Sequence, residues 1–490
     1  MHALTKNNIK TSLKSGFKNK NIRFIIFRYF IYALQFGNSL LIARNLGPYF
    51  MGHLGFAMLI IQYVTQINLG IPNALNVKLS SYEGKDYEKQ KVFLGNSVLF
   101  MSLHSLVILM LAASCFFAEI PIFDKYNFYA YLIIVVSNAV AQNFDLLFIH
   151  VFRVKNLLKP ITLYQSVTPL LNFLACIFFK QQQLLYAILI SQLFSYVLCL
   201  IIFLLKTPIK LNLKPNIAVF KELIKTGSAL MLYSASFYFI MIVTRTFVSY
   251  YYNVSELGYF SFALSFAQAS FLALDTITFL IMPKMINRFK HAEGGKALEK
   301  MQYIKDNYTL ISYLLIFFTI LIFPIILYFV PNYANSFKSF ALLSLCEALL
   351  SGNFGISVLF ISHGKERLLG KIALFSFLLN LLLVWIISYN TSAFYFICFA
   401  PIGTYIVYTA LLGYFYNVAF LNKRSIKSLF SNFDTRLVLP ALLLSVAVIT
   451  DNVILQITAY ALVLLFNWKR MKGIAGIASK LIHNPAVFKI

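Results

Sequence analysis

The sequence predicts an all-α polytopic membrane protein. Of its 490 residues, 60% are hydrophobic and only 12% are charged, and the mean hydropathy is +0.76. A soluble domain is about half apolar and about a quarter charged, so this composition excludes a water-soluble protein. The net charge of +26 then raises the question of which side of a membrane holds the positive residues, and we expect no nucleic-acid partner.

Apolar segments long enough to cross a bilayer recur along the whole chain. A hydrocarbon core about 30 Å thick requires about 20 apolar helical residues, and the chain holds about fourteen such segments. The last two are short, so twelve or thirteen spans remain open. The segments cover residues 22–43, 49–76, 92–117, 127–150, 160–179, 183–205, 223–250, 256–282, 307–330, 336–361, 368–389, 392–417, 435–450 and 453–468.

The connections between these segments predict the orientation of the chain. With the N-terminus in the cytosol, 36 of the 42 Lys and Arg residues fall on the cytosolic side and only four on the other side. The positive-inside rule therefore predicts an even number of spans with both termini cytosolic. Even the longest cytosolic loops, 206–222 and 283–306, are too short to form a soluble domain.

An internal repeat predicts two related lobes of six helices each. The identical pairs are Gly52/Gly258, Phe56/Phe262, Ala57/Ala263 and Gln62/Gln268 at an offset of 206, and Leu157/Leu368, Leu158/Leu369 and Ile161/Ile372 at an offset of 211. An even number of helices gives both lobes the same topology. The predicted domains are a basic leader (1–21), an N-terminal lobe (22–205), a linker (206–222), a C-terminal lobe (223–417) and two extra helices with a basic tail (418–490).

Several turns between the predicted spans resemble those of a known transporter family. The matching segments are Ala43–Gly52 (ARNLGPYFMG), Leu69–Ala74 (LGIPNA), Glu256–Phe260 (ELGYF), Met282–Lys284 (MPK) and Phe329–Tyr333 (FVPNY). Their order resembles that of Wzx-like flippases for O-antigen and capsule repeat units, in the multidrug/oligosaccharidyl-lipid/polysaccharide exporter superfamily. This chain departs from the family pattern at Thr244, which precedes Arg245. Many relatives carry an acidic residue at this position, so a role that depends on its carboxylate is not expected here.

This resemblance implies both an architecture and a function. The two lobes would enclose a central cavity, in which an undecaprenyl-diphosphate-linked oligosaccharide passes from the cytosolic to the outer leaflet. Such a lipid transporter would act in the bacterial inner membrane in the synthesis of O-antigen (lipopolysaccharide), capsule or exopolysaccharide. Alternating access would be coupled to a proton or Na⁺ gradient, without a cofactor. The expected partners are the lipid-linked oligosaccharide, membrane lipid and the repeat-unit polymerase machinery.

Polar residues inside the predicted spans are the candidates for this transport. A charge at this depth is costly unless it faces a bundle interior or water, and several of these residues fall into stripes at helical spacing. We expect the stripes to line the cavity. Interhelical hydrogen bonding is an equal alternative for the Ser and Gln stripes, and snorkelling to the interface is the alternative for Arg28. The substrate-binding candidates are Arg28, Gln35, Gln142, Arg245 and Gln268, and the ion-coupling candidates are Asp145, Asp275 and Glu347.

The two arginines are assigned to the diphosphate because guanidinium binds phosphate oxygens in bidentate geometry. No catalytic residue and no metal site are expected, since the five Cys lie in apolar runs and the His residues do not cluster. The main alternative is a cation-coupled drug or metabolite antiporter of the same superfamily. A membrane-embedded polymerase or ligase is disfavoured because the outer loops are short.

Overall fold

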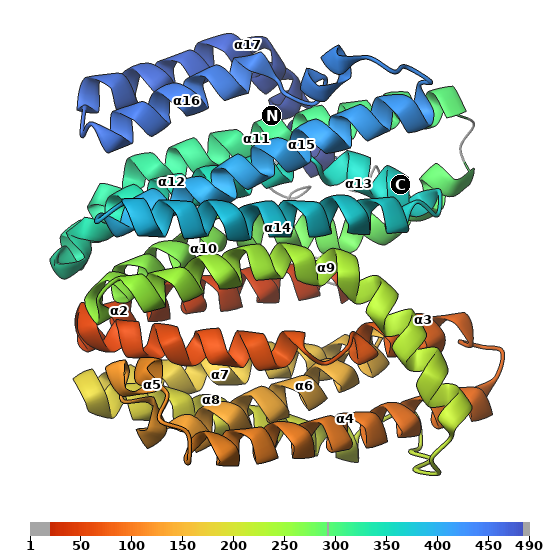
Figure 1. The fold of residues 1–490 in the computed structure, drawn as a ribbon. Coiled ribbons are helices and arrows are strands. Elements are labelled where there is room, and N and C mark those ends of the chain that lie inside the picture. The colour runs from red at the N-terminus through yellow and green to blue at the C-terminus, as the bar shows by residue number, and fades with distance from the viewer. Residues whose placement is uncertain (1–19, 292–293, 484–490) are drawn as a thin grey trace, which may run out of the picture. The chain divides into compact units, whose positions relative to one another are not determined.

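The computed structural model describes residues 20–291 and 294–483. Almost all of them are helical, as the sequence predicts, and every predicted span falls on a helix (Figure 1). The chain separates into two compact units, residues 1–231 and 232–490, and the division falls inside one helix, α9 (Ile217–Tyr251).

Unit 1 contains seven labelled α-helices, a 3₁₀ turn and the first part of α9. They are α2 (Lys20–Gln66), α3 (Ile71–Ser81), α4 (Tyr87–Cys115), α5 (Pro121–Lys125), η1 (Phe128–Ala130), α6 (Leu132–Val154), α7 (Leu158–Phe178) and α8 (Gln181–Leu205). The label α2 covers two helical arms, because the backbone leaves helical geometry at Gly47 (φ 70°) immediately before Pro48. A positive φ suits glycine, which has no Cβ to clash.

Unit 2 contains the rest of α9 and the following elements. They are α10 (Val254–His291), α11 (Gly294–Phe329), η2 (Pro331–Ser336), α12 (Phe337–Ser351), α13 (Phe354–Ser362), α14 (Glu366–Asn390), η3 (Phe394–Cys398), α15 (Phe399–Phe420), η4 (Ile426–Phe430), α16 (Thr435–Ile449) and α17 (Val453–His483). The predicted span 336–361 corresponds to α12 and α13, which are separated only by Gly352 and Asn353 and together count as one span, Pro331–Ser362.

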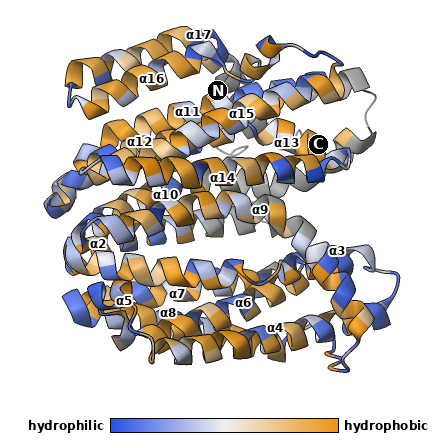
Figure 2. Ribbon diagram, in the orientation of Figure 1, coloured by the Kyte–Doolittle hydropathy of each residue, from blue (hydrophilic) through white to orange (hydrophobic). Residues whose placement is uncertain are grey.

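The helices carry the composition of membrane spans. Within the described residues, eight helices are long and apolar enough to cross a bilayer, or nine when α2 and α3, bent by 46° at their break, count as one span. Figure 2 shows apolar residues along the lengths of the helices and hydrophilic residues gathered at helix ends and connections. The chain is thus an all-α polytopic membrane protein.

The aromatic cores of the two units repeat the same contact. In unit 1, the ring of Phe56 stacks on that of Tyr126 with 4.3 Å between centroids. In unit 2, Phe262 packs on Tyr333 at 4.4 Å. Phe56 and Phe262 are one of the pairs identified from the sequence at the offset of 206. The internal repeat therefore extends from sequence identities to packing within each unit.

Candidate functional site

Asparagine amides join the helices of unit 1 at membrane depth. Asn38 Nδ2 on α2 donates to the carbonyl oxygen of Pro169 on α7 at 2.6 Å. The carbonyl of Pro169 lies within α7. In a second bond of this kind, Asn138 Nδ2 on α6 donates to the carbonyl oxygen of Leu189 on α8 at 2.9 Å. Such bonds satisfy polar groups that find no water in the hydrocarbon core.

The corresponding helices of unit 2 meet at equivalent positions. Asn380 Nδ2 on α14 donates to the carbonyl of Ile240 at 3.1 Å and to Thr244 Oγ1 at 3.3 Å. Thr244 lies 206 positions after Asn38, and Asn380 lies 211 positions after Pro169, the two offsets of the sequence repeat. Thr404 Oγ1 on α15 completes the cluster by donating to Asn380 Oδ1 at 3.4 Å.

Gln142 and Asp145 lie three residues apart on α6, so they share a face of that helix. Asp145 is fully buried, and neither carboxylate oxygen has a hydrogen-bond partner among the described residues. The side-chain oxygen of Gln142 is unpartnered in the same sense. Gln35 lies half-buried on α2, where its carbonyl accepts a hydrogen bond from Ser39 Oγ at 3.0 Å.

Arg245 is a buried cation in unit 2. It is only 6% exposed on α9, and its Nη2 donates to Ser261 Oγ on α10 at 3.2 Å. Gln268 lies two helical turns beyond Ser261 on α10 and is exposed. The structure thus links Arg245 to the polar stripe that the sequence indicates on this helix.

The structure describes fewer contacts for the three remaining predicted residues, Glu347, Arg28 and Asp275. Glu347 is half-buried on α12 and lies within electrostatic range of Tyr405 on α15. The backbones of Arg28 and Asp275 lie in α2 and α10, but their side chains are outside the described part of the structure.

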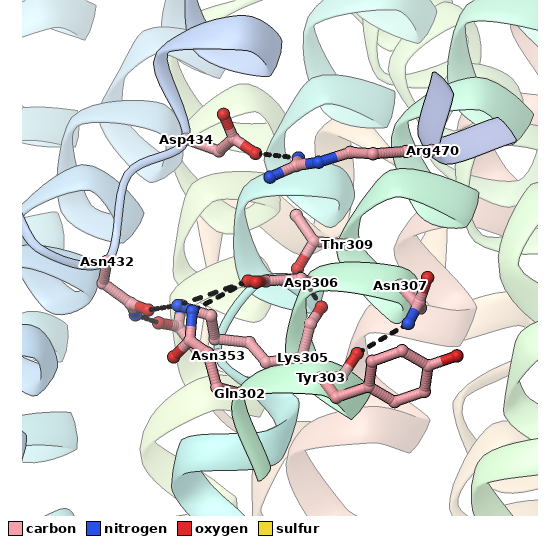
Figure 3. A network of polar contacts seen from close by, with 10 residues as sticks. All are labelled: Gln302, Tyr303, Lys305, Asp306, Asn307, Thr309, Asn353, Asn432, Asp434 and Arg470. Atoms are coloured by element: carbon pink, nitrogen blue, oxygen red, sulfur yellow. Dashed lines mark hydrogen bonds and ion pairs between the residues drawn. The ribbon is translucent and has the colours of Figure 1, made fainter. Parts of the chain in front are cut away.

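A buried polar network occupies the break between α12 and α13 (Figure 3). Lys305 on α11 is 7% exposed and donates from Nζ to Asn432 Oδ1 at 2.9 Å. Asn432 Nδ2 donates to Asn353 Oδ1, and Asn353 Nδ2 donates to Thr409 Oγ1, both at 2.8 Å. Nearby, Arg470 on α17 pairs with Asp434, which also caps the N-terminus of α16. The network joins the loop before α16 to the helices of unit 2.

Ion pairs connect helix ends in unit 1. Lys78 at the end of α3 pairs with Glu222 near the start of α9. Lys155 Nζ, just after α6, donates to Glu83 at 2.7 Å, and this hydrogen bond lowers the pKa of Glu83 below its ordinary value. The backbone N–H of Lys89 similarly lowers the pKa of Asp86, the N-cap of α4. These ends belong to the side that the charge pattern predicts to be cytosolic.

Several polar residues of these clusters did not emerge from the sequence. They are Asn38, Asn353, Asn380, Lys305 and Asn432. Neutral amides do not change the charge pattern from which the spans and loops are predicted. Lys305 lies in the predicted cytosolic loop 283–306, where an exposed side chain is expected. The helical spacing of Asn38 from Gln35 and the repeat-related positions of Asn38 and Thr244 are the signals that point to part of this set.

The fold defines the chain as a helical membrane protein, and two transporters of known structure share this fold. The structure is similar to an inward-facing multidrug resistance MATE family transporter of the MOP superfamily, at a TM-score of 0.67 and 13% identity, covering 82% of this chain and 100% of that one. It is also similar to the lipid II flippase MurJ in an inward closed conformation, at a TM-score of 0.64 and 15% identity, covering 92% of this chain and 100% of the other.

Comparison of the sequence with family models identifies the family of this chain. The model of the family described as polysaccharide biosynthesis protein matches residues 19–269, which is just over half of the chain. The chain therefore belongs to the polysaccharide biosynthesis protein family, within the MOP superfamily that its sequence motifs indicate. Comparison with curated proteins found no match.

Proposed function

We propose that this protein flips undecaprenyl-diphosphate-linked oligosaccharide repeat units from the cytosolic to the outer leaflet of the bacterial inner membrane. The observation that carries the proposal is the match of residues 19–269 to the polysaccharide biosynthesis protein family. The similarity in fold to a lipid II flippase supports it, since a lipid-linked saccharide poses the same physical problem. A polar headgroup must cross the bilayer core while its lipid tail stays in the membrane.

The side chains supply chemistry suited to such a headgroup. Arg245 offers a guanidinium for the diphosphate, and its Nη2 also donates to Ser261 Oγ. Arg28 has the same assigned role near the cytosolic end of its span. Gln35, Gln142 and Gln268 offer amides to sugar hydroxyls. No bond of the substrate breaks; the protein lowers the barrier to translocation.

We further propose that an ion gradient drives alternating access, with Asp145, Asp275 and Glu347 as candidate coupling residues and H⁺ or Na⁺ as the ion. A gradient biases the populations of inward-open and outward-open states only when the ion binds them with different affinities. Both termini lie in the cytosol in this proposal, because the Lys and Arg residues concentrate on that side.

The second candidate is a cation-coupled drug or metabolite antiporter, which the similarity to a MATE family transporter favours. One reconstitution separates the two. Purified protein is placed in liposomes with undecaprenyl-diphosphate-linked oligosaccharide, and exposure of the sugar is followed with an impermeant glycosidase, with and without a pH gradient. Protein-dependent exposure supports the flippase. Gradient-driven efflux of a cationic dye without sugar exposure would replace it by the antiporter.

A further inference from the structure

Asp145 is the one carboxylic acid among the buried polar residues of the described structure. Its side chain is fully buried within unit 1, and both oxygens lack a hydrogen-bond partner among the described residues. An ionised carboxylate in that position would lose its hydration without gaining a donor or a counter-ion, which is strongly unfavourable. A carboxyl that carries a proton avoids this penalty.

Among the side chains that the structure describes, none in electrostatic contact with Asp145 carries a compensating charge. Helix α6 packs against α2, α3, α4, α7 and α8. The side chains within electrostatic range of Asp145 are Tyr164 on α7 and Tyr196 and Cys199 on α8, all neutral near pH 7. The other His, Lys, Arg and Glu residues that these helices carry among the described side chains are His150 and Arg153 on α6 itself, Arg44 and His53 on α2, Lys78 on α3, Glu88, Lys89, Lys91 and His104 on α4 and Lys159 on α7. The side chain of Arg28 on α2 lies outside the described part of the structure.

The internal repeat offers a comparison for this position. The hydrogen bond from Asn138 to the Leu189 carbonyl in unit 1 has a counterpart from Cys346 Sγ to the Cys398 carbonyl in unit 2. Asn138 and Cys346 are 208 positions apart, and the same offset takes Asp145 to Asn353. The fold therefore places a polar side chain here in both units.

The two equivalent side chains, Asp145 and Asn353, differ in their hydrogen bonding. Asn353 is only 2% exposed, yet its amide nitrogen donates to Thr409 and its oxygen accepts from Asn432, each at 2.8 Å. Asp145 has no such partners among the described residues. In unit 2 the partners of Asn353 come from α15 and from the loop before α16, whereas the described residues of unit 1 supply no hydrogen-bond partner for the Asp145 carboxyl.

We propose that Asp145 is the proton-binding site through which a pH gradient drives transport. In the conformation described here, one carboxylate oxygen holds a proton taken from water on one side of the membrane. When α6, α7 and α8 rearrange and admit water from the opposite side, the O–H bond breaks and the proton leaves to that water. The inference rests on the proposed transport function for its role, but proton binding itself requires no substrate.

Proton binding is tested first on purified protein in nanodiscs, by the infrared C=O stretch of a protonated carboxyl as the pH is raised from neutral to mildly alkaline. We expect the wild type to show this band, Asp145→Asn to lose it, and Asp145→Glu to shift it. Asp124→Asn, which removes an exposed carboxyl of α5, is the matched control and should keep it. Should the Asn variant not fold, the shift in Asp145→Glu decides.

Three results would overturn the proposal: no band in the wild type, a band that persists in Asp145→Asn, or a band lost in Glu347→Gln instead. A band in the wild type that added Na⁺ removes would assign the site to Na⁺ and also contradict a proton site. In liposomes, Asp145→Asn should abolish the acceleration of flipping by a pH gradient. Loss of the band in Asp145→Asn without any flipping by the wild type would leave the proton site standing and refute the proposed function.

Discussion

The backbones of Gly70 and Gly227 lie in direct contact within unit 1. A Cβ atom built on Gly70 would lie 2.3 Å from the carbonyl oxygen of Gly227, and one built on Gly227 would lie 2.5 Å from the carbonyl oxygen of Leu69. Gly70 also has a positive φ of 68° at the break between α2 and α3. Only glycine at both positions lets the start of α9 approach this break so closely.

Alanine at Gly70 should therefore destabilise the protein. The strained backbone conformation and the overpacked contact each cost about 1–3 kcal/mol, and we expect a clear fall in Tm of the detergent-solubilised protein. Gly37→Ala is the matched control, since its Cβ would meet no atom within 4 Å, and alanine in a helix should be neutral or slightly stabilising. An unchanged Tm for Gly70→Ala would show that the two backbones are not in contact.

The same region is joined by the ion pair between Lys78 and Glu222. Both side chains are partly exposed, at 19% and 44%, so the pair should contribute no more than about 1 kcal/mol. Lys78→Glu and Glu222→Lys should each lower Tm, whereas the double exchange should restore it. A double-mutant cycle with no coupling free energy would rule out this contribution.

A pH-dependent contribution is expected from Glu83. Its hydrogen bond from Lys155 lowers its pKa in the folded protein below the ordinary 4.5. A lowered pKa stabilises the fold at pH values above the unfolded pKa, and this stabilisation is lost as the pH falls through the folded pKa. Glu83→Gln should therefore lower Tm slightly at neutral pH and have no effect at pH values well below 4.5. A decrease in Tm of Glu83→Gln that is the same at all pH values would contradict an ionic origin of this stabilisation.

Arg245 provides a test of substrate recognition. Under the proposed function, Arg245→Gln removes charge-assisted hydrogen bonds to the diphosphate, worth about 1.5–3 kcal/mol, so flipping should fall about 10- to 100-fold. Ser261→Ala removes only the hydroxyl that accepts from Arg245 and should reduce flipping much less. Equal rates for Arg245→Gln and the wild type would exclude the guanidinium from substrate binding.

The sequence predicts some features of the fold and of the candidate site and misses others, depending on the kind of residue that forms each feature. Hydropathy and loop charge predict the helices because they reflect the bilayer itself, and the pair Phe56/Phe262 predicts the repeat. The separation of α12 from α13 at Asn353 and the contact of Gly70 with Gly227 depend on tertiary neighbours, so neither hydropathy nor loop charge predicts them. The burial of Asp145 is likewise predictable, whereas its lack of partners depends on which side chains α7 and α8 present.

The network around Lys305 gives the last prediction. Its ammonium donates to Asn432 and lies 3.8 Å from the half-exposed Asp306, so Asn432→Ala would leave the buried cation and the amide of Asn353 without their neutral partner. Loss of a hydrogen bond to this buried cation should lower stability by about 1.5–3 kcal/mol, with Asp306 remaining as its ion-pair partner. The double variant Lys305→Met, Asn432→Ala removes the charge as well and should recover much of this loss, because an apolar side chain of similar length then fills the site. Thermal unfolding of the three proteins measures the difference. If the double variant proves no more stable than Asn432→Ala, the buried charge is not the cause of the loss.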